Sequence, residues 1–276
     1  MENKMSIILA IAITAVVCIG GMSVLGGGSS EASETELSVT GSTTVQPLMS
    51  LFKENFENVT VGVSISITGG GSGQGISSAA QGTADIGMAS RALKSSEKTQ
   101  YPDLVETRIA NDGVAVIVGS NAGVTALTME QIRGVYNGTY TNWNQVGGND
   151  ATIVVYNREA SSGTRDCFES VVMSGSNFVL TANEVASNGA MKTSVANNQN
   201  SIGYVGLGYL DATTNEVTVD GVAPTVQNVT DEVYPIARGL FLLTDGAPTG
   251  WAGAFINWIL SPSGQEMVAE KGFVPL

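Results

Sequence analysis

Short hydrophobic stretches alternate with turns of glycine, serine and threonine along most of the chain. Residues 61–67 read V-G-V-S-I-S-I, and this period of two is typical of a half-buried strand. Further strands are expected at residues 37–39, 84–88, 114–118, 153–156, 202–205 and 217–219. Several of them lead through a small polar turn into a helical pattern. This alternation predicts an α/β fold with mostly parallel strands.

The helical patterns follow these turns. One runs through Leu48, Phe52 and Phe56, with Pro47 in its first turn, where proline is tolerated. Others run to Gln81 and through Phe168, and two more fill residues 251–271 on either side of a Ser-Pro pair. From the topology we expect one lobe made of residues 37–120 plus 235–276, and a second lobe made of residues 121–234.

The N-terminus has a different character. Residues 5–25 carry no charge, one lysine precedes them, and a Gly- and Ser-rich segment with glutamates follows. Such a run is long enough to span a bilayer, and the charge asymmetry places the bulk of the chain outside the cytoplasm. We expect a signal or membrane anchor at residues 1–25 and a flexible linker at residues 26–36. Cys18 lies where a lipoprotein signal has its cysteine, but Val17 replaces the small residue expected before it. The protein is therefore expected to be extracytoplasmic, either anchored to the outer face of the membrane or secreted.

Composition excludes several classes of function. The 276 residues carry a formal charge of −13 and no histidine. The absence of histidine removes Ser-His-Asp triads and most zinc sites. No run of lysine or arginine is present, so a nucleic acid partner is not expected. We expect no cofactor and no metal. Cys167 is expected to be a small buried residue, since no histidine is available to activate its thiol.

Four turns between strands and helices share one chemistry. They contain Ser42-Thr43-Thr44, then Ser72 between glycines, then Ser90-Arg91, and finally Arg158 with Ser162-Gly163-Thr164. Hydroxyls, helix N-termini and arginines are donors for anions, and ligands of open α/β sheets bind beyond the carboxyl ends of strands. Each turn alone is as well explained by ordinary N-capping. Together the four turns predict a site for a small tetrahedral oxyanion.

These segments also resemble a known family. The matching pieces are TGSTTVQPL (40–48), GGGSGQG (69–75), ADIGMASR (84–91), TNWNQVGG (141–148), NREASSGTRDCF (157–168), IGYVGLGY (202–209) and the terminal GFVPL. They make the chain similar to the phosphate-binding proteins of ABC phosphate importers over residues 37–276. The resemblance implies a two-lobed type II periplasmic binding fold. Each lobe would hold a mostly parallel sheet flanked by helices, and two crossover strands would join the lobes. It also implies delivery of inorganic phosphate to ABC permease subunits without chemistry on the ligand. We expect the protein to be a monomer.

The resemblance assigns ligand contacts to Ser42, Thr43, Thr44, Ser72, Arg158, Ser162, Gly163 and Thr164. From the chemistry of the third turn we expect Ser90 and Arg91 to contact the ligand as well. One position departs from the family pattern. Many members have an aspartate after the serine of the third turn, and it accepts the proton of phosphate, whereas this chain has Arg91, which only donates. Rejection of sulfate would then need another acceptor, such as a backbone carbonyl, a hydroxyl, Asp112 or Asp166. Alternatives are a binding protein for sulfate, molybdate or tungstate, a phosphate-ester hydrolase, and a surface protein that reuses the fold.

Overall fold

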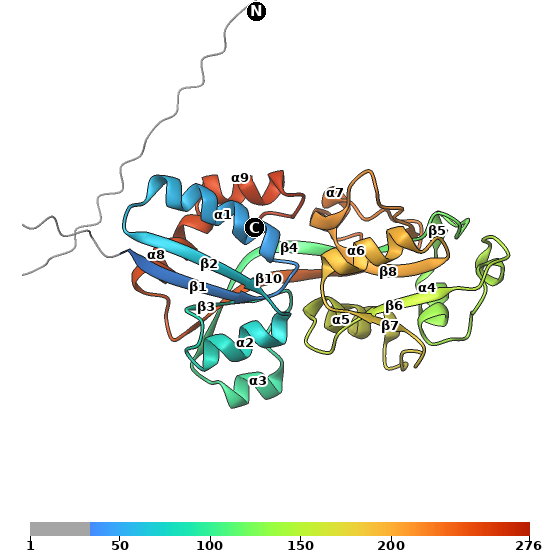
Figure 1. Ribbon diagram of the computed structural model, residues 1–276, viewed down its shortest axis with the longest axis horizontal. Coiled ribbons are helices and arrows are strands. Elements are labelled where there is room, and N and C mark those ends of the chain that lie inside the picture. Colours follow the sequence, from blue (N-terminus) through green and yellow to red (C-terminus); the bar gives the residue numbers. More distant parts are fainter. Residues whose placement is uncertain (1–33) are drawn as a thin grey trace, which may run out of the picture. The chain divides into compact units, whose positions relative to one another are not determined.

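The computed structural model describes residues 34–276, and the anchor and most of the linker predicted above lie outside the described residues. The described part has two lobes joined by long strands (Figure 1). The first lobe begins with β1 (Thr35–Gly41), α1 (Gln46–Val59), β2 (Val63–Gly69), α2 (Ser72–Ala80), β3 (Ile86–Ala89) and α3 (Ser95–Gln100). It is completed by α8 (Gly250–Ile259) and α9 (Pro262–Glu270), the two C-terminal helices expected from the sequence.

The second lobe is built from the middle of the chain. Its strands are β5 (Ala126–Leu127), β6 (Val154–Arg158), β7 (Asn183–Val185), β8 (Ser201–Gly206) and β9 (Thr218–Val219). Its helices are α4 (Met129–Tyr136), α5 (Gly163–Phe168), α6 (Asn188–Asn197) and α7 (Val226–Thr230). Short 3₁₀ turns cover Trp143–Val146 and Leu207–Tyr209, and one π-helical turn (Glu169–Met173) continues α5.

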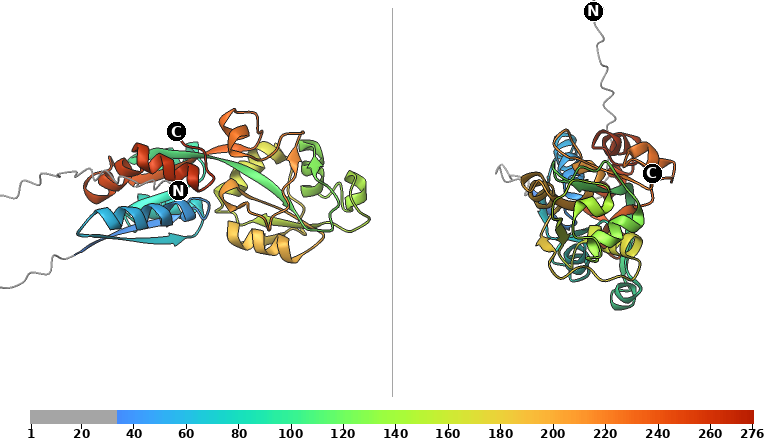
Figure 2. Two further views of the ribbon diagram at one scale, coloured as in Figure 1. Left: turned by 90° about the horizontal axis from the view of Figure 1, so that it is seen from above. Right: turned by 90° about the vertical axis from the view of Figure 1, so that its right-hand side faces the viewer.

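Two crossover strands connect the lobes, as Figure 2 shows from above. They are β4 (Leu104–Val118) and β10 (Ala237–Asp245), and they pair antiparallel with each other. The strand order is β2-β1-β3-β10-β4-β8-β6-β7. The set β2-β1-β3 is parallel and so is the set β8-β6-β7. The expected parallel sheet of each lobe is therefore present. The crossover strands β10 and β4 lie between the two parallel sets, so that all eight strands form one continuous sheet.

Each lobe has its own hydrophobic core. Core residues of the first lobe come from positions 37–110 and 240–273, whereas those of the second lobe come from positions 114–236 together with Val274. The first change of lobe falls inside β4, between Ala110 and Val114. The lobe limits expected at residues 120 and 235 stay predictions.

The strand β4 is longer than the sequence suggests. In this region the hydrophobic pattern predicts a strand only at residues 114–118. In the structure, β4 pairs with β10 over residues 104–113 and with β8 over residues 114–118. Within this strand, Asn111 also exchanges two backbone hydrogen bonds with Val274, at 2.7 and 3.0 Å.

Glycines allow α2 to lie directly on the ends of β1 and β3. A Cβ atom at Gly41 or at Gly75 would lie 2.4 Å from the carbonyl oxygen of Met88. This close approach places the start of α2 beside the end of β3, so Ser72 and Ser90 come together.

Within residues 34–276, every helix falls short of the length and apolar character that a bilayer crossing requires.

Candidate functional site

The second, third and fourth predicted turns meet where the lobes touch. Ser72 and Ser90 are hydrogen-bonded to each other within the first lobe. Their hydroxyl oxygens lie 3.3 Å apart, and the Ser90 backbone N–H donates to Ser72 Oγ at 3.0 Å. Gly163 of the second lobe faces both of them. A Cβ atom at Gly163 would lie 2.3 Å from Ser72 Oγ and 2.7 Å from Ser90 Oγ. Glycine is therefore required there for the lobes to close to this distance.

The first turn meets the second lobe through its two threonines. Thr44 Oγ1 lies 3.0 Å from Thr164 Oγ1, and both side chains are buried. Thr43 Oγ1 accepts a 3.3 Å bond from Arg158 Nη2. Ser42 and Ser162 are buried as well, and each hydroxyl oxygen accepts a backbone N–H, from Thr44 and Arg165 respectively. Nine of the ten predicted residues are thus buried at the junction of the lobes.

Arg158 is one of two buried cations in this group, the other being Arg238. It is 1% exposed, and Glu159 accepts from its Nε and Nη2 at 2.8 and 2.9 Å. Its Nη1 is buried and has no hydrogen-bond partner. A buried charged donor without a partner is costly, and an anion seated beside Nη1 removes this cost. Because Glu159 already occupies the Nε–Nη2 edge, the edge available to a ligand is the one that includes Nη1.

Three hydrogen bonds from Asn188 and Arg238 fix the orientation of the Thr43 and Thr44 hydroxyls. Asn188 Nδ2 donates to Thr43 Oγ1 at 3.2 Å and to Thr44 Oγ1 at 2.9 Å, and Arg238 Nη2 donates to Thr44 Oγ1 at 3.2 Å. A hydroxyl has two lone pairs and one proton. With its oxygen facing donors, Thr43 can direct its own proton to an acceptor outside this network. Such protons are the donors that an oxyanion needs.

Asn188, Arg238 and Tyr209 are contacts that sequence reasoning missed. Asn188 begins α6 and resembles a helix cap in the sequence, but Ser187 caps the helix and the Asn188 side chain reaches the first lobe. Arg238 is buried and pairs with Asp112 at 2.8 Å. Tyr209 donates to the carbonyl oxygen of Thr43. Burial raises the pKa of Tyr209 to about 12, so the phenol keeps its proton and acts as a donor at neutral pH.

Arg91 differs from the other nine predicted residues. Its Nε donates to Asp166 at 2.6 Å, and its Nη1 and Nη2 each donate to Glu97 at 2.7 Å. Its guanidinium group is thus paired with two carboxylates, and its contact with a ligand stays a prediction. Asp112 and Asp166, the two carboxylates expected as proton acceptors, are likewise paired with cations.

Cys167 lies beside the site in α5, with its Sγ 3.9 Å from the Ala237 carbonyl oxygen. Burial raises the pKa of its thiol, so the group is neutral at neutral pH and a poor nucleophile.

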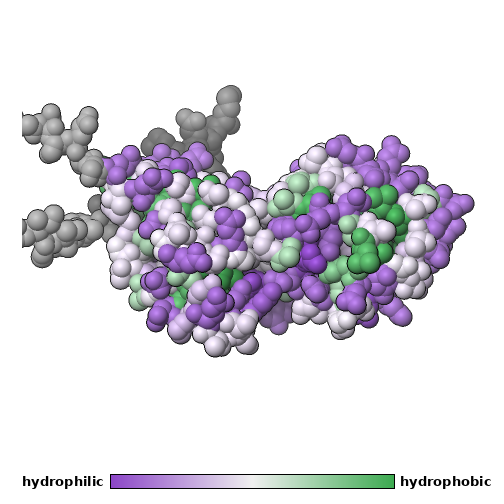
Figure 3. Space-filling view, turned by 60° about the horizontal axis from the view of Figure 1, so that its bottom comes forward, coloured by the Kyte–Doolittle hydropathy of each residue, from purple (hydrophilic) through white to green (hydrophobic). Residues whose placement is uncertain are grey.

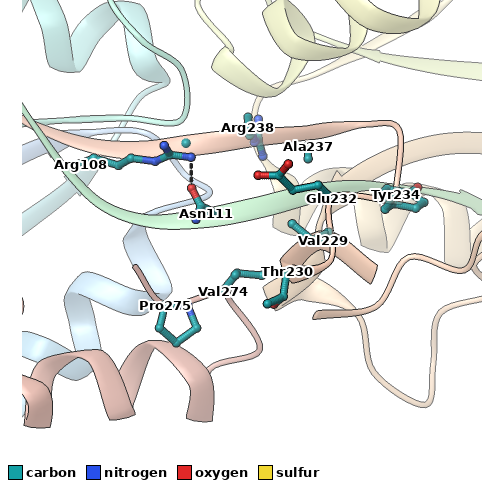
Figure 4. A pocket seen from close by; sticks show the side chains of 11 residues that line it. Arg108, Asn111, Val229, Thr230, Glu232, Tyr234, Ala237, Arg238, Val274 and Pro275 are labelled. Atoms are coloured by element: carbon teal, nitrogen blue, oxygen red, sulfur yellow. Dashed lines mark hydrogen bonds between the residues drawn. The ribbon is translucent and has the colours of Figure 1, made fainter. Parts of the chain in front are cut away.

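A separate cavity of about 360 Å³ lies beside the crossover strands (Figure 4). Arg108 and Asn111 of β4 line it together with Glu232 of the second lobe. Figure 4 shows Arg238 behind β10, away from the Glu232 side chain. The ten predicted residues are not among the lining residues. Arg238, whose Nη2 donates to Thr44 Oγ1, also lines this cavity, so the cavity adjoins the group of donors on the side of the crossover strands.

Comparisons with known proteins agree with this geometry. The PBP superfamily domain matches residues 27–263. The phosphate-binding protein PstS of Bacillus subtilis is 31% identical over 248 residues, which cover 89% of this chain and 82% of that protein.

Two solved structures are also similar. One is a Clostridium perfringens protein named as a phosphate ABC transporter substrate-binding protein and solved with bound phosphate. It has 39% identity, a TM-score of 0.84, and coverage of 88% of this chain and 100% of that chain. An ABC-type phosphate transport receptor from Vibrio cholerae has 35% identity, a TM-score of 0.72 and the same coverage. These similarities confirm the expected two-lobed type II periplasmic binding fold.

Proposed function

The chain belongs to the PBP superfamily and, within it, to the family of the phosphate-binding protein PstS, and on that premise we propose that it captures inorganic phosphate between its lobes. It then delivers the ion to the membrane subunits of an ABC permease. The protein acts outside the cytoplasm as a monomer, held at the membrane by its N-terminal segment or secreted.

The observation that carries this proposal is the unpartnered Nη1 of Arg158. It is buried, and Nη2 of the same guanidinium donates to the Thr43 hydroxyl of the first lobe. The neighbouring Thr44 hydroxyl contacts that of Thr164 in the second lobe. A tetrahedral oxyanion offers acceptors in several directions, so it can use donors from both lobes at once. Charge-assisted hydrogen bonds of this kind are about twice as strong as neutral ones. Phosphate binding therefore favours the closed arrangement of the lobes.

Discrimination against sulfate needs an acceptor, because phosphate carries a proton at neutral pH and sulfate does not. We assign this role to Glu159, whose carboxylate sits on Arg158 and is 18% exposed. A carboxylate oxygen that accepts one N–H has a further lone pair. It accepts the phosphate proton but repels the bare oxygen of sulfate. Glu159→Gln is expected to narrow the ratio of phosphate to sulfate affinity, and an unchanged ratio would refute this assignment.

A phosphate-ester hydrolase is the alternative from a different class. Hydrolysis requires an activated nucleophile or a metal-bound water. The group between the lobes consists of donors, with Glu159 and Asp112 already paired with arginines. We therefore propose binding without chemistry. A phosphatase assay with and without divalent metal ions tests this point, and turnover of a phosphate ester would contradict it.

Isothermal calorimetry of the full chain against phosphate, arsenate, sulfate and molybdate tests the function. We expect saturable binding of phosphate and arsenate, which share charge and protonation, with sulfate and molybdate weaker. Molybdate or sulfate binding more tightly than phosphate would assign the chain to a different oxyanion. No heat with any of the four ions would favour a surface protein that reuses the fold.

A further inference from the structure

A group of four charged residues joins the lobes beside the donor group. Arg91, Lys94 and Glu97 belong to the first lobe, and Asp166 lies in α5 of the second lobe. Asp166 accepts from Arg91 Nε at 2.6 Å and from Lys94 Nζ at 2.8 Å. One carboxylate of the second lobe is thus held by two cations of the first. In Figure 3, which brings the face with α3 and α5 forward, hydrophilic residues gather where the lobes meet.

Glu97 prepares Arg91 for this contact. Its carboxylate receives two bonds from Arg91, and its Oε2 also accepts the backbone N–H of Lys94. Burial favours the neutral acid, but the bonds from Arg91 and Lys94 outweigh it, so the pKa of Glu97 is lowered. Glu97 is therefore charged at neutral pH and fixes the guanidinium plane. Because these bonds lie within the first lobe, closure of the lobes is not needed to form them.

Burial makes this contact stronger than a typical surface ion pair. The Arg91 and Asp166 side chains are 11% and 18% exposed. Exposed pairs contribute little because water screens them and because two long side chains must be ordered. Here Glu97 has already ordered Arg91, and the lobes exclude most of the water. The ion pair can therefore favour closure.

We propose that Arg91, Lys94 and Asp166 form a latch that closes the lobes and slows release of the bound ion. This proposal rests on the proposed function for the ion, but closure itself can be measured without any ion. It gives Arg91 a role in closure instead of ligand contact. It also explains how Arg91 is tolerated beside the site, because two carboxylates balance its charge.

The Gly73 amide provides a direct measurement of closure. Its N–H donates to the carbonyl oxygen of Ser161 on the other lobe, at 2.9 Å. Gly73 lies in the first turn of α2, where an amide has no acceptor within the helix. When the lobes open, this amide is exposed to water. Its hydrogen exchange, followed by NMR on the full chain, therefore reports the population of open molecules.

Asp166→Asn is expected to accelerate exchange at Gly73 on the order of tenfold, the ratio that a change of about 1.4 kcal/mol gives. It should accelerate phosphate release by a similar factor. The direction of the change in phosphate affinity separates the latch from a simple charge effect. Removing a negative charge near an anion site would by Coulomb's law alone strengthen phosphate binding, whereas loss of the latch weakens it. Tighter phosphate binding with unchanged exchange at Gly73 would overturn the latch. Exchange unchanged both with and without phosphate would overturn it as well.

Matched variants separate the latch from general effects. Asp211→Asn removes an equal charge from the Lys192–Asp211 pair, which lies within the second lobe, and should leave exchange at Gly73 unchanged. Lys94→Met removes one of the two contacts from a half-exposed side chain, so it tests the latch even if Asp166→Asn folds poorly. Asp166→Glu keeps the negative charge and should therefore slow exchange at Gly73 relative to Asp166→Asn. In an Arg91→Met background, Asp166→Asn should add little, because the two residues act as one unit. If the chain binds no phosphate, the exchange data still decide whether the latch exists.

Discussion

We expect Arg158 to be the single residue on which binding of an anion depends most. Its Nη1 is buried and unpartnered, and loss of a hydrogen bond to a charged group costs roughly 1.5–3 kcal/mol. Arg158→Ala should therefore weaken phosphate binding on the order of 10- to 150-fold in calorimetry. Lys192→Met is the control, since it removes a positive charge from the same lobe at the surface pair with Asp211. Equal affinities of the native chain and Arg158→Ala would remove Arg158 from the site.

For single residues, the sequence predicts which side chains supply hydrogen-bond donors to the site better than it predicts which residues they contact. The serines, threonines and Arg158 follow strands, so their common location can be predicted from topology. Asn188 cannot be found in this way, because an asparagine at the start of a helix has the ordinary explanation of a cap. The pairing of Arg91 with Asp166 joins positions 75 apart in sequence. Nothing local to Arg91 indicates that a distant carboxylate will occupy its donors.

At the scale of elements, the crossover strands are held together by the buried pair of Asp112 and Arg238. The two residues lie directly opposite each other in the β4–β10 register. Their side chains are 0% and 4% exposed, with a 2.8 Å contact. Removing one partner leaves a buried charge unpaired, which costs about 3–5 kcal/mol. Asp112→Asn should therefore lower the free energy of unfolding by about this amount in urea denaturation.

The control for this prediction removes both charges. In Asp112→Leu with Arg238→Met, no buried charge is left unpaired, so part of the lost stability should return. A free energy of unfolding within about 0.5 kcal/mol of the native value in Asp112→Asn, the range of ordinary surface substitutions, would show that the pair does not stabilise the crossover. The same pair explains why β4 could not be predicted as one strand. A charged residue in mid-strand argues against a strand until its buried partner, 126 positions away, is known.

At the scale of the whole molecule, Gly163 sets how closely the lobes can approach. A Cβ atom there would meet the hydroxyls of Ser72 and Ser90 on the opposite lobe. Gly163→Ala should therefore leave both lobes folded and prevent full closure. We expect a nearly unchanged melting temperature, phosphate binding at least tenfold weaker (a loss of about 1.4 kcal/mol or more), and no decrease in radius of gyration on adding phosphate. The native chain should become more compact in the same X-ray scattering experiment.

Gly189→Ala is the matched control for this change. Gly189 lies in the first turn of α6 in the same lobe, and the nearest atom to a Cβ there is Ser187 Oγ at 3.8 Å. This variant should bind phosphate and close as the native chain does. If Gly163→Ala also compacts on adding phosphate and binds it with native affinity, contact between Gly163 and the two serines does not limit closure.

The division of the two cores along the chain also bears on the order of folding during synthesis. The core of the second lobe uses one continuous stretch, apart from Val274, whereas the core of the first lobe needs both Leu37 and Phe273. During synthesis, nearly all residues of the second lobe therefore emerge while the first lobe still lacks β10, α8 and α9. The N-terminal strands of the first lobe must wait, unpaired on one edge, until the last residues emerge. Contacts this distant in sequence form slowly, so completion of the first lobe is expected to limit the rate at which the newly made protein becomes able to bind.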